Sequence, residues 1–157
     1  MPRSSVEDPL KNSNFVVEVD GFARAGFSEV TGLSRKTEVI KYREGGDNAQ
    51  PRLSAGTTDY DPITLKRGIL ASSQLGSYDM FSFVLDVHNI QARTFQSKDY
   101  RRDIDIVIPD RTGLTATRYR IFNAWPSEWK LGDLNATNNE TWVEELVLQN
   151  EGLDRVF

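Results

Sequence analysis

Apolar and polar residues alternate at every second position in many parts of this sequence, and this pattern most restricts the possible folds. Within residues 103–108, for example, three isoleucines alternate with Asp103 and Asp105. Successive side chains of a strand point to opposite faces, so this period predicts half-buried β-strands. Comparable runs, bounded by turn-forming residues, occur at six more places: residues 14–20, 22–27, 34–43, 63–68, 114–123 and 142–148.

One segment has a helical period instead. Mostly apolar residues recur there at a spacing of three or four and would form a stripe along one face of a helix. They follow a serine that can cap the helix: Ser72 or Ser73, then Leu75, Tyr78, Phe81, Val84 or Leu85, and His88. This spacing predicts one amphipathic helix. The expected fold class is therefore mainly β (α+β), with two packed antiparallel sheets forming a barrel-like sandwich and one flanking α-helix.

The length of 157 residues suits a single domain spanning residues 1–157. Residues 1–13 have little apolar content, which is typical of a flexible N-terminal arm. Residues 43–58 are expected to form an extended loop between two strands. Residues 54–62 and 124–140 are rich in turn-forming or irregular sequence and are not expected to be strands.

Composition argues against several classes of protein. Cysteine is absent, which removes disulfides, thiolate metal ligands and thiol nucleophiles. The net charge is −4 with both signs mixed, whereas a nucleic-acid-binding protein usually shows a basic surplus. No apolar run approaches the roughly 20 residues that span a bilayer, and the N-terminus has no apolar signal region. We therefore expect neither a membrane anchor nor a signal peptide.

The residue types needed for catalysis are sparse. His88 is the one histidine of the chain, so no pair of histidines is available, and its place on the helix stripe favours a structural role. Asp59 and Asp61 flank Tyr60 beside a proline, which is more typical of a turn than of paired catalytic acids. Asp103 and Asp105 share a strand face, where solvated or interface charge is more common than a cation site. The sequence predicts no enzyme, no cofactor and no metal site.

The loop KYREGGDNAQPR, residues 41–52, is polar, carries both charge signs and contains paired glycines. A phosphate-binding loop needs a helix directly after its glycines, and none is predicted there. A calcium loop needs oxygen ligands at fixed positions with a closing glutamate, and the loop lacks them. Two interpretations remain open from these residues alone, an ordinary surface hairpin and a docking arm.

The tryptophans allow a further alternative. Trp125, Trp129 and Trp142, with Phe122, could pack in the core or form a ligand platform. Core packing is the more common use of such residues. The platform interpretation corresponds to a second function class, a monomeric β-barrel binding module.

Seven segments in order resemble the tail tube proteins of contractile phage tails and of related phage-like contractile injection systems. They are NFVVEVDG (14–21), AGFSEVTGL (25–33), EVIKYREGGDN (38–48), ITLKRG (63–68), NAWPSEWK (123–130), DLNATNNE (133–140) and EGLDRV (151–156). The resemblance covers essentially the whole chain, and it rests on the order of the set rather than on any one segment.

This resemblance implies a structural subunit that forms homohexameric rings, which stack into a hollow tube. A surrounding sheath contracts and drives the tube, so the implied partners are the sheath protein, baseplate or spike and tail-terminator components, and a cargo of protein effector or DNA in the lumen. It also implies assembly in the bacterial cytoplasm and a place in a phage tail or injection particle.

In that family the long hairpin reaches the adjacent ring, so residues 43–58 are identified as an inter-ring loop. The resemblance places six residues at the contact between subunits: Arg43, Glu44, Gly45, Gly46, Asp47 and Asn48.

Overall fold

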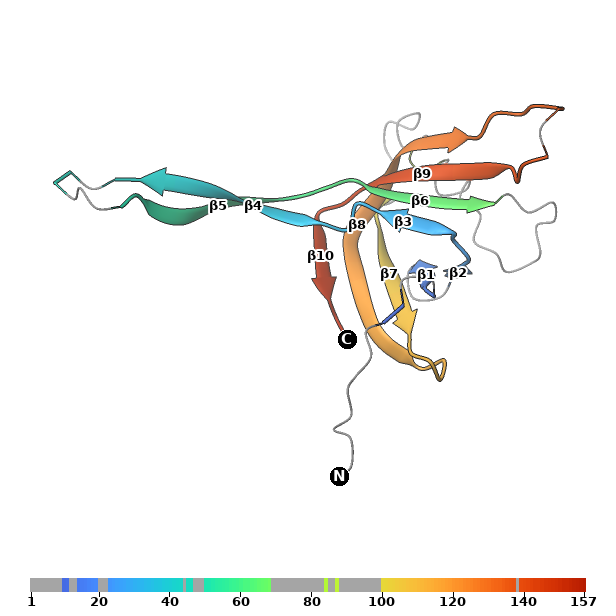
Figure 1. The fold of residues 1–157 in the computed structure, drawn as a ribbon, viewed down its shortest axis with the longest axis horizontal. Coiled ribbons are helices and arrows are strands. Elements are labelled where there is room, and N and C mark those ends of the chain that lie inside the picture. The colour runs from blue at the N-terminus through green and yellow to red at the C-terminus, as the bar shows by residue number, and fades with distance from the viewer. Residues whose placement is uncertain are drawn as a thin grey trace, which may run out of the picture.

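The chain folds as β-strands in all the elements that the computed structural model describes (Figure 1). The structure describes residues 10–11, 14–19, 23–43, 45–46, 50–68, 84, 87, 100–137 and 139–157. Its ten strands are β1 (Val16–Val19), β2 (Ala23–Ala25), β3 (Glu29–Thr31), β4 (Arg35–Tyr42), β5 (Arg52–Tyr60), β6 (Ile63–Gly68), β7 (Arg102–Pro109), β8 (Thr115–Leu131), β9 (Val143–Gln149) and β10 (Gly152–Arg155).

Eight strands form one antiparallel sheet: seven follow the order β2-β1-β7-β8-β9-β6-β3, and the eighth, β10, pairs with β8 outside this order. Strand β8 has 17 residues and belongs to both halves of this sheet. Its first part pairs with β7 and β10, and its last part pairs with β9. Between the two parts lies Asn123, whose φ of 50° is in the left-handed region that Asn tolerates better than most residues.

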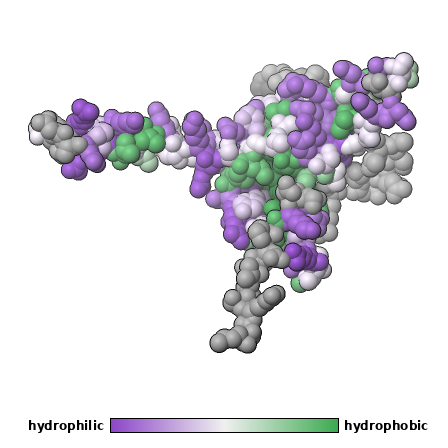
Figure 2. Space-filling model, viewed as in Figure 1, coloured by the Kyte–Doolittle hydropathy of each residue, from purple (hydrophilic) through white to green (hydrophobic). Residues whose placement is uncertain are grey.

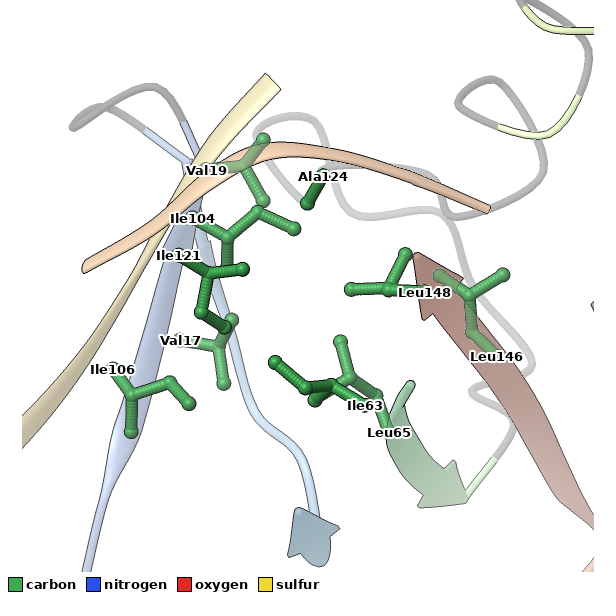
Figure 3. Close-up of a cluster of buried hydrophobic side chains, with 10 residues drawn as sticks. All are labelled: Val17, Val19, Ile63, Leu65, Ile104, Ile106, Ile121, Ala124, Leu146 and Leu148. Atoms are coloured by element: carbon green, nitrogen blue, oxygen red, sulfur yellow. The ribbon is translucent and has the colours of Figure 1, made fainter. Parts of the chain in front are cut away.

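The core lies between these two halves (Figure 3). One half contributes Val17, Val19, Ile104, Ile106 and Ile121, and the other contributes Ile63, Leu65, Leu146 and Leu148. These residues come from the alternating positions that the sequence pattern predicted to face inward. The two packed layers of the prediction are therefore confirmed, but both belong to a single sheet that bends along β8.

The predicted barrel-like closure is wrong for the strands that the structure describes. β2 and β3 lie at the two ends of the strand order and do not pair with each other. The second sheet contains only β4 and β5 and projects away from the core (Figure 1). Alternation predicts which face of a strand is buried, but it does not predict which strand edges meet.

Four strand assignments also differ from the sequence prediction. Strand β3 lies between two predicted strands, and β5 occupies a segment expected to be turns. Strand β8 continues through a segment expected to be irregular, and β10 pairs near the chain's end. In each case a partner strand satisfies the backbone hydrogen bonds, and this tertiary pairing outweighs weak local propensity. The turn predicted at 110–113 is confirmed: Asp110 accepts hydrogen bonds from Thr112 and Leu114, and Gly113 has a φ of 87°.

The predicted helix falls within residues 72–88, which lie outside the described residues except for Val84 and Val87. Val84 is partly buried and packs against the core. No helical element is present among the described residues, so the flanking helix stays a prediction. His88 and most of the N-terminal arm, residues 1–13, also lie outside the described residues.

Candidate functional site: the projecting hairpin

The hairpin of β4 and β5 extends far from the rest of the chain (Figure 1). Its strands pair antiparallel, with Arg35 opposite Tyr60 near the base and Tyr42 opposite Arg52 near the tip. Every residue of β4 is exposed, and most of β5 is exposed as well. The hairpin therefore has an antiparallel ladder that is interrupted by one register shift between Thr37 and Val39, and little of the described chain packs against its faces.

Four large apolar side chains are uncovered on this hairpin, and they are named here the hairpin patch: Val39, Ile40, Tyr42 and Leu53. The exposed fraction of these four residues ranges from 45% to 64%. Val39 and Leu53 share one face, while Ile40 and Tyr42 share the other, as the strand register requires. Figure 2 shows the hydrophobic surface along the hairpin, bordered by hydrophilic residues. An exposed apolar patch with a polar border is typical of an interaction site.

The base of the hairpin is tightly built. Gly32 has a φ of 85°, and a Cβ at this position would lie 2.1 Å from the Pro62 carbonyl oxygen. The Ser34 hydroxyl donates a hydrogen bond to the Asp61 carboxylate, and Asn150 Nδ2 donates to the Asp61 carbonyl oxygen at 3.0 Å. Asp61 therefore shapes the turn, as predicted, and these contacts set the direction in which the hairpin leaves the body.

The predicted contact residues lie at the tip of the hairpin. Arg43, Gly45 and Gly46 are exposed, and Gly46 has a φ of 99° in a turn, a conformation that glycine adopts without strain. Glu44, Asp47 and Asn48 lie outside the described residues. The contact role of all six stays a prediction. The sequence analysis overlooked the hairpin patch beside the tip. Its apolar residues were visible in the sequence, in the segment TEVIKYR and at Leu53.

A charged network covers the outer face of the sheet, opposite the core. Arg118 Nη1 donates to Glu18 at 2.9 Å and to Asp105 at 2.8 Å, while Arg120 Nε donates to Asp105 at 2.7 Å. Asp105 is only 2% exposed. Hydrogen bonds and charge attraction from Arg120, and then from Arg118, lower the pKa of Asp105 although its burial opposes this.

This network explains the acidic residues that the sequence analysis singled out on β7. The Asp105 carboxylate is bound by two guanidinium groups, and the Asp103 carboxylate accepts the Asn123 backbone N–H at 3.1 Å. Both therefore have structural partners. Across the described ranges, no group of three or more His, Asp or Glu side chains is placed to bind a metal ion.

The three tryptophans have different surroundings. Trp129 packs against the core, and its Nε1 donates to Glu144 at 3.2 Å, so core packing is confirmed for this residue. Trp125 stands edge-on to Tyr100, with 6.0 Å between ring centroids. Trp142 is exposed and donates its Nε1 proton to the Gly132 carbonyl oxygen.

The part of the chain that the structure describes contains no helix long and apolar enough to cross a membrane.

Unpaired end strands in the described sheet and an exposed apolar hairpin are typical of one class of protein, the β-sheet proteins that bind other chains. Residues 11–154 match the family model of the T4-like virus tail tube protein gp19. The chain therefore belongs to the tail tube protein family, and the family suggested by the sequence resemblance is confirmed. A search of curated protein sequences finds no match.

Solved structures show the same fold. A chain of the PVC sheath–tube complex, from an extracellular contractile injection system in the extended state, aligns with a TM-score of 0.76 and 24% identity over 96% of this chain and 93% of that one. A chain of the PVC sheath/tube terminator aligns with a TM-score of 0.77 and 24% identity over 96% of this chain and 99% of that one. A chain of the anti-feeding prophage baseplate aligns with a TM-score of 0.73 and 23% identity over 95% of this chain and 96% of that one.

Proposed function

We propose that this chain is the inner-tube subunit of a contractile injection system or phage tail. Its copies form hexameric rings, and the rings stack into a hollow tube that delivers cargo when a surrounding sheath contracts. Membership of the tail tube family supports this function. The neighbouring structures, which include sheath–tube, terminator and baseplate complexes, support sheath, terminator and baseplate or spike components as partners.

The observation that carries the proposal is the hairpin. A strand pair with eight exposed residues on β4, and with apolar side chains on both faces, is poorly stabilised in an isolated chain. It becomes buried if each copy contacts another copy. In this proposal the tip residues Arg43, Glu44, Gly45, Gly46, Asp47 and Asn48 take part in the inter-ring contact, and each polar contact is weak but is repeated around the ring.

The proposed role is structural, with no catalytic step and no cofactor. The rings assemble in the bacterial cytoplasm and become part of a phage-tail-like particle. The lumen carries either protein effectors or DNA.

Negative-stain electron microscopy of the purified chain, together with light scattering, tests the proposal. We expect rings with a central hole or stacked tubes. A matched variant lacking residues 45–48 should remain folded by circular dichroism but should fail to stack. A chain that stays monomeric at every concentration, even with baseplate components added, would instead favour the monomeric binding module.

A further inference from the structure

Two short connections join the projecting hairpin to the body, and together they are named here the hinge: residues 32–34, which follow β3, and residues 61–62, which precede β6. The strand pairing of the body ends at Thr31 on one connection and at Ile63 on the other. The pairing of the hairpin begins only after the hinge, with β4 and β5. Strand pairing therefore does not by itself fix the angle between the hairpin and the body.

A side chain of the body holds the second of these connections. Ile63 pairs with Leu148, so Asp61 and Asn150 stand opposite each other two residues farther along the chain. The pairing of β6 with β9 ends before this position, where the chain turns from β9 toward β10 beside the base of the hairpin (Figure 1). Asn150 Nδ2 donates a hydrogen bond to the Asp61 carbonyl oxygen at 3.0 Å. This side-chain bond takes the place of the next backbone hydrogen bond of the ladder.

Asp61 also joins the two connections to each other. Its carboxylate accepts a hydrogen bond from the Ser34 hydroxyl, so the path from Asn150 through Asp61 to Ser34 links the body to both connections. A second link to the body, between Arg35 and Asp154, is 3.6 Å long, and the two side chains are 56% and 67% exposed. Exposed ion pairs of this kind contribute little, so the bond from Asn150 is the better candidate for fixing the hinge.

Asn150 has a feature that stability alone does not explain. Its Oδ1 atom is buried, and within the described part of the chain no hydrogen-bond donor reaches it. A buried oxygen atom without a partner costs free energy, and an apolar side chain at this position would avoid that cost. An apolar side chain could not donate to Asp61, however. The amide is therefore explained by the bond that it makes to the hinge.

We propose that Asn150 is a positioning residue, whose hydrogen bond to Asp61 fixes the angle of the hairpin in the single chain before copies meet. This inference rests on the proposed tube function and adds the residue that prepares the chain for assembly. A mobile hairpin would lose its motion when copies associate, and that loss opposes binding. A hairpin whose angle is already fixed avoids this loss, so tubes form at a lower concentration.

The distance between two spin labels in the monomer tests this role. The natural sequence has no cysteine, so Leu53→Cys on the hairpin and Leu114→Cys at the β7–β8 turn place one label each at exposed positions. Pulsed electron paramagnetic resonance, at a concentration where light scattering shows monomers, gives the distribution of distances. We expect one narrow distribution in the labelled chain. Asn150→Asp keeps the shape of the side chain but removes the donor, so it should broaden the distribution about twofold.

Two further variants make the result specific. Asn150→Ala removes the donor without adding a charge, and it should broaden the distribution in the same way. The matched control is Gln149→Glu, which makes the same amide-to-carboxylate change at the adjacent residue, whose Nε2 donates to Ser127 instead of the hinge. The control should leave the distribution narrow. Narrow distributions in both Asn150 variants, or equal broadening in the control, would overturn the positioning role.

Assembly of the same variants, without the added cysteines, separates this role from the proposed function. Light scattering and electron microscopy give the lowest concentration at which tubes form. We expect this concentration to rise about fivefold for Asn150→Asp, as for the loss of one hydrogen bond, and to stay unchanged for Gln149→Glu. If the natural chain forms no tubes, the tube function fails, while the label distances still decide whether Asn150 fixes the hinge. A broadened distribution with an unchanged concentration would overturn the contribution of Asn150 to assembly.

Discussion

The body of the molecule and its projecting hairpin have the same kind of backbone pairing but very different surroundings. In the body, ten core residues are at most 7% exposed, because the two halves of one sheet pack against each other through these side chains. On the hairpin, every residue of β4 is exposed. The comparison teaches that two strands can pair by hydrogen bonds while their side chains remain exposed. A stable fold, in contrast, requires that apolar side chains be buried.

The hairpin nevertheless depends on the body for its direction. Gly32 and Asp61 lie at the base, where close packing and hydrogen bonds join the hairpin to the main sheet. We therefore expect substitutions in the body to change folding, and substitutions on the outer hairpin to change association. Three variants can break or sharpen this distinction.

The largest effect on folding is expected for Leu148→Ala. Leu148 is fully buried in the core, so the substitution removes apolar contacts and leaves a cavity. We expect the free energy of unfolding to fall by about 3 kcal/mol. Urea denaturation of the dilute chain measures this. A change as small as that of an exposed position would show that the core does not supply the body's stability.

A smaller effect is expected for Asp105→Asn. The substitution removes the charge that Arg118 and Arg120 bind, and it leaves those guanidinium groups with a weaker acceptor. We expect a loss of about 2 kcal/mol at neutral pH. This is less than the loss from breaking a fully buried pair, because the two arginine side chains are 28% and 38% exposed.

The same variant has a specific dependence on pH. The pKa of Asp105 in the folded chain lies below the ordinary value of 3.8, so the unfolded chain binds a proton first as the pH falls. The stabilisation from this carboxylate is therefore present above pH 3.8 and is lost as the pH falls through the lowered pKa. Unfolding curves from neutral to acidic pH should show that Asp105→Asn loses less stability on acidification than the natural chain. Parallel losses would contradict the role assigned to Asp105.

The smallest effect on folding is expected for Leu53→Ala on the hairpin. This side chain is exposed in the single chain, so we expect the free energy of unfolding to change by less than about 0.5 kcal/mol. Urea denaturation at a concentration where light scattering shows monomers provides the measurement, with Leu148→Ala as the matched comparison. A loss comparable to that of Leu148→Ala would mean that the hairpin patch is already buried within its own chain.

Particular elements show how far sequence reasoning extended. The strands at β1, β6, β7 and β9 were predictable because apolar residues recur at every second position, although Glu18 of β1 and Asp105 of β7, on the opposite face, are buried as well. The turn at Asp110 was predictable from its local hydrogen-bonding residues. Strand β5 was not, because its residues alternate weakly and only the pairing with β4 makes them a strand.

The candidate site was predicted only in part. Paired glycines and charges drew attention to the tip, and the family resemblance placed the tip at a contact between subunits. The apolar side chains beside it were overlooked, because the sequence alone does not tell whether Val39 or Leu53 faces a core or water. The structure settles this point, since no layer of the described chain lies over either face of the hairpin.

The amino-acid sequence by itself determined the mainly β character of the protein, the inward faces of its strands and its family. Each of these depends on side-chain period or on local residue order, which are properties of the chain as written. Only the tertiary structure decided that one sheet bends along β8 to enclose the core, that the described strands at its two ends do not pair with each other, and that β4 and β5 leave it. The reason is that strand edges and uncovered faces depend on contacts between residues far apart in sequence, which no local pattern encodes.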